Sequence, residues 1–206
     1  MSEPGAGHRE EWAERVRSAY ACLPGGGTVE PGFGPLGVDV VAEDWPAAAA
    51  LARDTLGLSY FDWLSAVDEG EDGIRVVAHL ARHRPGAVEH LLQRTLLPAA
   101  APVVGSVVEV YAGAGWHERE THEMFGVDFS RDGRVLDLAP LLLPDEFAGH
   151  PLRKDFVLVS RVVRPWPGAK EPGESDATRT TSRRRARPPG VPDPAVWGPR
   201  REDGDG

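Results

Sequence analysis

The sequence predicts an α+β fold, a two-layer domain in which helices pack on one mixed or antiparallel sheet, followed by an extended C-terminal tail. Two observations predict the domain: segments with helical spacing are interspersed with β-branched runs, and an acidic, glycine-containing turn at 68–73 separates two of those runs. The third observation is compositional. Proline, glycine and charge dominate 161–206, leaving too little apolar area to offset the entropy of ordering. We therefore divide the chain into a helical and turn-rich lead-in (1–37), a domain (38–160) and an extended or disordered tail (161–206).

The lead-in and the start of the domain predict a helix and then a strand. Trp12, Val16 and Tyr20 recur four residues apart between 8 and 20, which is the spacing of one helix face. The β-branched run at 38–41 then predicts a strand.

A short alanine-rich helix and a hairpin are expected next. Asp44 can cap the helix, Pro46 fits its first turn because the missing N–H costs nothing there, and Gly57 can close it. The strand-like runs 60–67 and 74–80 flank the acidic turn and predict an antiparallel pair.

The next segments predict one ambiguous element and one long helix. The run 87–97 has apolar residues at helical spacing, but a strand fits its place in the order equally well. Ser106 and Glu109 have the spacing of a capping box, which predicts a helix from 106 to Phe125. Gly126 is expected to end that helix.

Composition excludes several classes of protein. The chain has 23 Lys and Arg against 32 Asp and Glu, and a net charge of −9 repels a nucleic-acid backbone. Cys22 is the only cysteine, whereas iron–sulfur clusters and structural zinc usually need three or four thiolates. We therefore expect no cofactor in this chain. We read no secretory signal or membrane-spanning stretch, so a cytoplasmic location is expected, with membrane contact only through partners.

Three apparent motifs are better explained without catalysis. A dinucleotide-binding loop would need a strand before it and a helix after it, but here Pro35 and a strand follow the glycines, so we expect a turn. The letters of that motif stand at Gly32, Gly34 and Gly37. His117 and His122 are five residues apart and therefore about 140° apart on a helix, which disfavours a shared zinc ion. The arginine run at 183–187 has no interleaved aromatic residues, so a solvated cluster or docking arm is expected.

The stretch 116–126 mixes charges of both signs with aromatic and apolar residues, and a second polar stretch follows at 150–156. Arg119 and Glu123 could simply form an i, i+4 pair on a solvated face. The mixture of anchors and charges is also typical of a protein interface. A metal-dependent hydrolase that uses the His/Glu-rich helix is an alternative of another class.

These two stretches resemble the family formed by the C subunit of NADH-quinone oxidoreductase, respiratory complex I. The family pattern of Glu-Arg-Glu, two variable residues, an acid, an apolar residue, an aromatic and a glycine is matched at 118–126. Its Gly-x-Pro-Leu-Arg-Lys-Asp-aromatic ending is matched at 149–156, and 61–68 is similar to its strand motif. The resemblance covers about 38–158, and the tail beginning at 164–168 is similar to that of actinobacterial members.

The resemblance implies a peripheral-arm subunit of a proton-translocating enzyme. Such a subunit packs against the D subunit, which helps form the quinone site, and lies near the iron–sulfur subunits B and I on the cytoplasmic side of the membrane. FMN, iron–sulfur clusters, NADH and quinone (ubiquinone or menaquinone) would be bound by other subunits, and no catalytic residue is expected here. The implied interface residues are Glu118, Arg119, Glu120, Glu123, Phe125, Gly126, Pro151, Leu152, Arg153, Lys154, Asp155 and Phe156.

The sequence also departs from the family pattern. The family usually has aspartate at the position of Glu123, a His-Pro pair after the aromatic corresponding to Phe129, and an Arg-Arg pair before the leucines; 137–140 reads Asp-Leu-Ala-Pro here. These differences favour a divergent paralogue. They also keep open the equivalent subunit of a related membrane-bound hydrogenase or alternative-donor complex.

Overall fold

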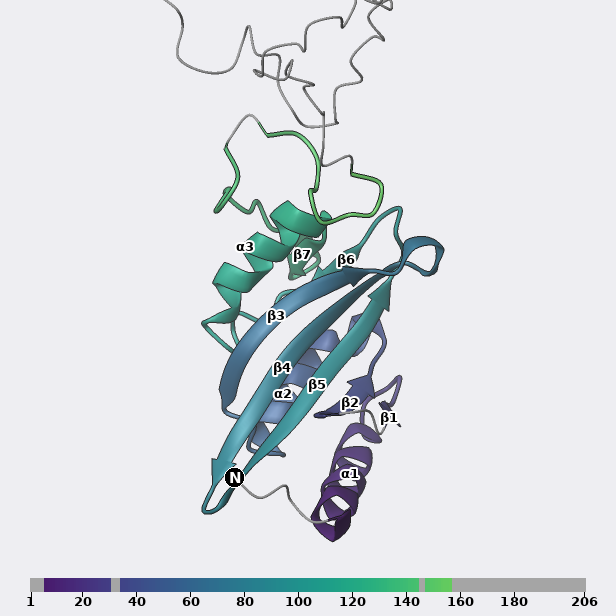
Figure 1. Ribbon diagram of the computed structural model, residues 1–206, viewed down its shortest axis with the longest axis vertical. Helices are drawn as coiled ribbons and strands as arrows, with labels where there is room; N and C mark the ends of the chain where they lie inside the picture. The colour runs from purple at the N-terminus through teal and green to yellow at the C-terminus, as the bar shows by residue number, and fades with distance from the viewer. Residues whose placement is uncertain (1–5, 31–33, 145–146, 157–206) are drawn as a thin grey trace, which may run out of the picture.

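The computed structural model describes residues 6–30, 34–144 and 147–156. The predicted tail at 161–206 lies outside these residues. Figure 1 shows a long curved sheet with helices behind it and at its edges. In order, the elements are α1 Ala6–Tyr20, β1 Thr28–Glu30, β2 Leu36–Asp39, η1 Ala42–Asp44, α2 Trp45–Asp54, β3 Tyr60–Asp68, η2 Gly70–Asp72, β4 Ile74–Arg84, β5 Ala87–Leu97, β6 Val103–Gly105, α3 Ala114–Phe125, β7 Asp128–Arg131 and β8 Arg134–Val135.

The predicted α+β fold class is confirmed, and of the two sheet types that the prediction left open, the main sheet is the mixed one. Its five strands lie in the order β1-β2-β5-β4-β3, and the β2–β5 pair is parallel while the other pairs are antiparallel. The predicted hairpin is confirmed as β3 and β4. The ambiguous segment 87–97 is the strand β5, because Leu91, Gln93 and Leu97 alternate onto the buried face.

The core joins the N-terminal lead-in to the domain. Trp12, Val16 and Tyr20 of α1 are buried in the same cluster as the apolar residues of the sheet, so the boundary placed at residue 37 separates no independent unit. Fully buried Gln93 accepts a hydrogen bond from the Tyr20 hydroxyl (3.0 Å) and donates one to the Trp45 carbonyl (3.1 Å). A buried amide satisfied on both sides fixes α1 and α2 against β5.

The alanine-rich helix α2 forms as expected, but its cap differs from the prediction. Asp44 precedes the helix without capping it through its side chain. Its carboxylate instead accepts the backbone N–H of Gly25 at 2.7 Å, tying the turn after α1 to the start of α2.

The predicted helix from 106 to 125 is shorter than expected. α3 begins at Ala114, and 106–113 is irregular. The capping-box prediction was wrong because the Ser106 hydroxyl donates to Glu118 of α3, while exposed Glu109 pairs with Arg131. The predicted end is confirmed: Gly126 is left-handed and its N–H donates to the His122 carbonyl at 2.8 Å.

A second, small sheet was not predicted. Three short strands lie in the order β6-β7-β8, with β6 and β7 parallel. Each is too short to carry a periodic pattern of its own. Across the described ranges, no helix combines the length and the apolar character needed to cross a bilayer.

Gly73 in the β3–β4 connection has a backbone conformation and a close contact that favour glycine. It has φ +129°, and a Cβ there would lie 2.2 Å from the Leu97 carbonyl oxygen. We expect Gly73→Ala to lower the free energy of unfolding by about 3 kcal/mol, through backbone strain and steric overlap. Gly86→Ala is the matched control. Gly86 also has a positive φ, but the space around it is open. Its substitution should therefore lower the free energy of unfolding by only about 1 kcal/mol. Urea unfolding of the two variants and the wild type measures both effects.

Candidate functional site

The stretches 116–126 and 150–156 bind each other at the C-terminus of α3. A helix leaves its last carbonyls without partners inside the helix, and here the second stretch supplies donors for three of them. The paired carbonyls and donors are Glu123 with His150 Nδ1 (2.9 Å), Met124 with the Leu152 N–H (3.0 Å) and Phe125 with Arg153 Nη1 (3.4 Å). The two motifs therefore form one structural unit.

Gly126 permits this close approach. Its φ is +71°, and a Cβ on it would lie 2.6 Å from Nε2 of the His150 ring. A larger residue would push His150 away from the helix end. The glycine that ends α3 is thus also needed for the second stretch to bind.

The second stretch is also tied to the sheet. Arg153 Nη2 donates to the Ala99 carbonyl at 3.1 Å, and the Lys154 N–H donates to Asp68 at the end of β3 at 2.8 Å. Backbone N–H groups of Lys154 and Gly70 hold the pKa of Asp68 below its ordinary value. The 150–156 stretch therefore connects α3 with the end of the hairpin.

Glu118 lies inside the molecule. Its side chain is almost wholly buried, and its carboxylate accepts the Ser106 hydroxyl (2.8 Å) and the Val107 N–H (2.7 Å). Burial raises the pKa of Glu118, although these two donors act in the opposite direction. Within this chain the carboxylate therefore fastens α3 to the segment after β6. That Glu118 is an interface residue stays a prediction.

Arg119 and Glu123 do not bond to each other but hold the same loop. Arg119 donates to the carbonyls of Ala139 (2.9 Å) and Pro140 (2.6 Å). Buried Glu123 accepts backbone N–H groups from 141–143, the shortest being Leu141 at 2.6 Å. Burial raises the pKa of Glu123, but these three donors and Arg119 outweigh it and leave the pKa below its ordinary value.

The side chains left exposed by these bonds mix apolar and charged groups. Trp116 is 63% exposed, Leu142 59% and Leu152 54%. Arg119 lies over the Trp116 ring at 5.4 Å, which restricts the indole. We call the following exposed residues the α3 surface: Trp116, Glu120, Leu142, Leu152, Lys154 and Asp155. The loop 139–143 was missed by sequence reasoning, because no local pattern links it to Glu123.

The histidines of α3 have separate neighbours. His117 packs edge-on against Phe61 with ring centroids 5.4 Å apart, while His122 Nδ1 lies 3.1 Å from the Val127 carbonyl. Within the described residues, no group of three or more His, Cys, Asp or Glu side chains is arranged to hold a metal ion.

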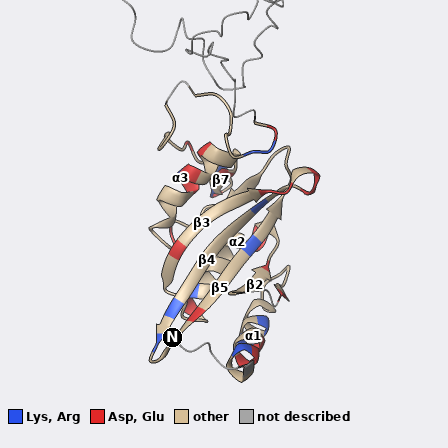
Figure 2. Ribbon diagram, viewed as in Figure 1, with Lys and Arg blue, Asp and Glu red and all other residues tan. Residues whose placement is uncertain are grey.

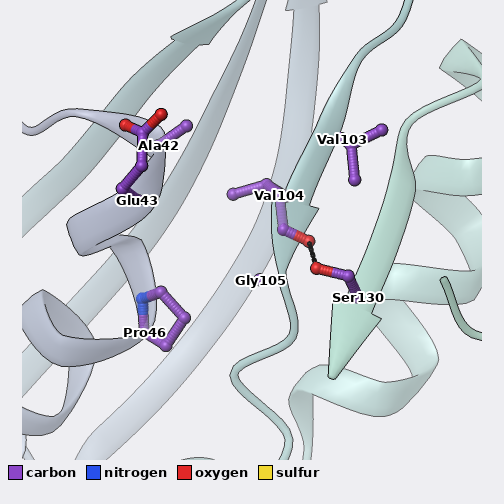
Figure 3. A pocket seen from close by; sticks show the side chains of 7 residues that line it. All are labelled: Ala42, Glu43, Pro46, Val103, Val104, Gly105 and Ser130. Carbon is purple, nitrogen blue, oxygen red and sulfur yellow. Dashed lines mark hydrogen bonds between the residues drawn. The ribbon is translucent and has the colours of Figure 1, made fainter. Parts of the chain in front are cut away.

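A shallow recess lies between η1 and the small sheet (Figure 3). Ser130 Oγ donates to the Val104 carbonyl at 3.4 Å, and a Cβ on Gly105 would lie 2.3 Å from Pro46. The residues that line the recess are Ala42, Glu43, Pro46, Val103, Val104, Gly105 and Ser130. Glu43 is the only titratable group among them, so the recess offers no acid–base pair.

The fold defines a structural class that also occurs in a respiratory membrane complex. A chain in the solved structure of the membrane-bound sulfane sulfur reductase, an archaeal respiratory membrane complex, matches with a TM-score of 0.58 and 22% identity. The match covers 84% of this chain and 99% of that one.

The sequence comparisons show the family. The family described as respiratory-chain NADH dehydrogenase, 30 Kd subunit, matches residues 38–162, and the chain belongs to it. The C subunit of NADH-quinone oxidoreductase from Acidithiobacillus ferrooxidans is 38% identical over 163 residues, which are 73% of this chain and 77% of the relative. The C subunit of the F(420)H(2) dehydrogenase from Methanosarcina mazei is 40% identical over 106 residues, which are 50% of this chain and 64% of the relative. The resemblance found in the sequence is confirmed.

Glu118 and Glu123 are expected to affect stability with opposite dependence on pH. A raised pKa favours the protonated folded state, so the stability linked to Glu118 is lost as pH rises through its folded pKa. A lowered pKa favours the ionised folded state, so the stability linked to Glu123 is lost as pH falls through its folded pKa. Urea unfolding of Glu118→Gln and Glu123→Gln between about pH 3 and about pH 7 measures both. For each variant, the difference from wild type in the free energy of unfolding should change with pH, with opposite slopes for the two variants. Slopes of the same sign would contradict the opposite pKa shifts of Glu118 and Glu123.

Proposed function

We propose that this chain is a peripheral-arm subunit of a proton-translocating NADH:quinone oxidoreductase and carries no redox cofactor of its own. It holds the quinone-site D subunit and the iron–sulfur subunits B and I in position on the cytoplasmic side of the membrane. FMN, the clusters, NADH and quinone are bound by those and other subunits, and the membrane is contacted through the complex. Membership of the 30 Kd subunit family and the similarity to the C subunit of NADH-quinone oxidoreductase support the proposal.

The observation that carries the proposal is the α3 surface. Its large exposed apolar side chains are Trp116, Leu142 and Leu152, and its exposed charged ones are Glu120, Lys154 and Asp155. Buried aromatic anchors surrounded by a polar rim are what protein interfaces use for affinity and specificity. The backbone beneath these side chains is held by α3 and the bonds of Arg119 and Glu123, so little order remains to be gained on binding.

The implied interface residues divide into two groups. Glu120, Leu152, Lys154 and Asp155 expose their side chains and contact partners in our proposal, together with Trp116 and Leu142. The others position that surface from within or beside it: Glu118, Arg119, Glu123, Phe125, Gly126, Pro151, Arg153 and Phe156.

A second candidate is the equivalent subunit of a complex with another electron donor. The 40% identity to the C subunit of the F(420)H(2) dehydrogenase favours it. The α3 surface would serve the same purpose there. Affinity purification of the tagged full chain from its own cells separates the two candidates, because the electron-input subunits that copurify differ.

Trp116→Ala is expected to weaken assembly by at least tenfold, because an aromatic anchor that is buried at an interface contributes about 2 kcal/mol or more. The measurement is the amount of partner subunits retained with the tagged chain during purification, relative to wild type. The free variant should unfold at the wild-type urea concentration, since Trp116 is 63% exposed.

Tyr60→Ala is the matched control for this experiment. Tyr60 is 62% exposed and aromatic but lies at the start of β3, outside the α3 surface. Its substitution should leave the retained partners within twofold of wild type. Equal retention by both variants, or equal loss in both, would contradict the proposed surface.

A further inference from the structure

A basic cluster lies at the end of the molecule opposite the α3 surface, where α1 meets the β4–β5 hairpin (Figure 1). His8 and Arg15 of α1 and Arg82 and Arg84 of β4 surround Glu89 of β5. The Glu89 carboxylate lies 3.2 Å from Arg84, 3.5 Å from His8 and 3.6 Å from Arg15, and Arg82 Nε donates directly to it. We call these five residues the Glu89 cluster.

The Glu89 cluster has more positive than negative charge. Within the described ranges, Glu89 is the only carboxylate at ion-pair distance from these three arginines. One carboxylate compensates one guanidinium, which leaves two guanidinium charges in excess. The chain as a whole has a net charge of −9, so the excess is confined to this cluster, and exposed Glu11 and Glu14 lie beside Arg15 on α1. Figure 2 shows basic positions at the hairpin end of β4 and on α1, with an acidic position on β5 between them.

Two of the three guanidinium groups, those of Arg15 and Arg82, pack on an aromatic ring. The Trp12 ring has the Arg15 guanidinium at 5.2 Å and the Arg82 guanidinium at 5.3 Å from its centroid. The Trp12 indole N–H donates to the His90 carbonyl at 3.1 Å, and Arg82 Nη1 donates to the Leu56 carbonyl at 2.7 Å. These bonds reduce the side-chain entropy that a ligand would otherwise have to remove.

Two of the three guanidiniums are accessible. The Arg15 side chain is 42% exposed and that of Arg84 is 50% exposed, whereas Glu89 is buried and Arg82 is only 16% exposed. The accessible groups come from two separate elements, α1 and the tip of the hairpin. They therefore present an open surface with two binding points, which suits an extended chain with repeated anionic groups.

We propose that the Glu89 cluster is a docking site for a carboxylate-rich segment of another protein. The planar guanidinium fork can match a carboxylate in two parallel hydrogen bonds. Within the cluster the Glu89 carboxylate accepts one hydrogen bond from Arg82 and one from Arg84, so carboxylate binding by these guanidiniums already occurs there. Arg15 and Arg84 each bind one carboxylate of the segment, while Arg82, Trp12 and Glu89 position them. This site lies apart from the α3 surface and stands independently of the proposed function.

The test follows the indole N–H signal of Trp12 in the ¹⁵N-labelled full chain during titration with an octaglutamate peptide at low salt. The chain has six tryptophans, and Trp166 and Trp197 flank the arginine run 183–187 in the sequence, so their indole signals serve as the control for peptide binding to that run. We expect the Trp12 signal, assigned with Trp12→Phe, to shift saturably. The double variant Arg15→Gln/Arg84→Gln should weaken the affinity measured at Trp12 at least fivefold.

The matched control removes two arginines elsewhere. Arg17→Gln/Arg134→Gln has the same net charge as the test variant, and Arg17 lies on the same helix but pairs with Glu10 and Glu14. It should bind within twofold of wild type. The double variant Arg15→Lys/Arg84→Lys keeps both charges but lacks the guanidinium fork, so its affinity for the peptide should be intermediate. It provides a second test in case the glutamine variant misfolds.

Three results would overturn the proposal. The first is a shift confined to Trp166 and Trp197. The second is equal weakening by the two glutamine double variants, which would indicate attraction by net charge alone. The third is an equally tight response of Trp12 to inorganic phosphate, which would identify a small-anion site instead of a peptide site.

Discussion

The hydrogen bonds between the end of α3 and the stretch 150–153 are the constraint on which the rest of the candidate site depends. Unpartnered carbonyls at a helix end must find donors or remain in water, and here one segment supplies most of those donors. Because Arg153 and the Lys154 N–H also bind Ala99 and Asp68, the helix end and the end of the hairpin are linked through the same few residues. The His-Pro-Leu-Arg sequence at 150–153 therefore has a structural role within this chain.

The charged residues of α3 contribute to the site mainly from inside. Glu118 fastens the helix to the segment after β6, and Glu123 and Arg119 hold the loop 139–143. Burial raises the pKa of Glu118 more than its donors lower it. For Glu123, burial is outweighed by the donors and Arg119 together. The pKa values of two glutamates on one helix therefore shift in opposite directions. The sequence of α3 suggests a solvated charged face, but few of its charged side chains are exposed. The apolar side chain of Trp116, in contrast, is exposed.

Local patterns predicted those parts of the fold that local forces determine. The face of α1, the β3–β4 hairpin and the stop at Gly126 follow from spacing and backbone preference. The capping-box prediction was wrong because the Ser106 hydroxyl donates to Glu118, twelve residues further along the chain. Local spacing cannot reveal such a partner. Segment 87–97 was ambiguous because its outer face is also apolar, with Val88 and Leu96 exposed. Within the candidate site, the two motifs identified two stretches that bond to each other, but only long-range contacts separate the residues that face outward from those that hold the loop.

A scaffold has to keep its contact surfaces at a fixed separation, and the arrangement of the sheet meets this requirement. The strands β4 and β5, of 11 residues each, run from the Glu89 cluster to the end where Asp68 binds the 150–156 stretch. At about 3.4 Å per residue they span about 35 Å without a break in their register. Their paired backbones resist stretching far better than a loop would, and helices on one face resist bending. In the scaffold function that we propose, the sheet would therefore keep the Glu89 cluster and the α3 surface at a fixed separation.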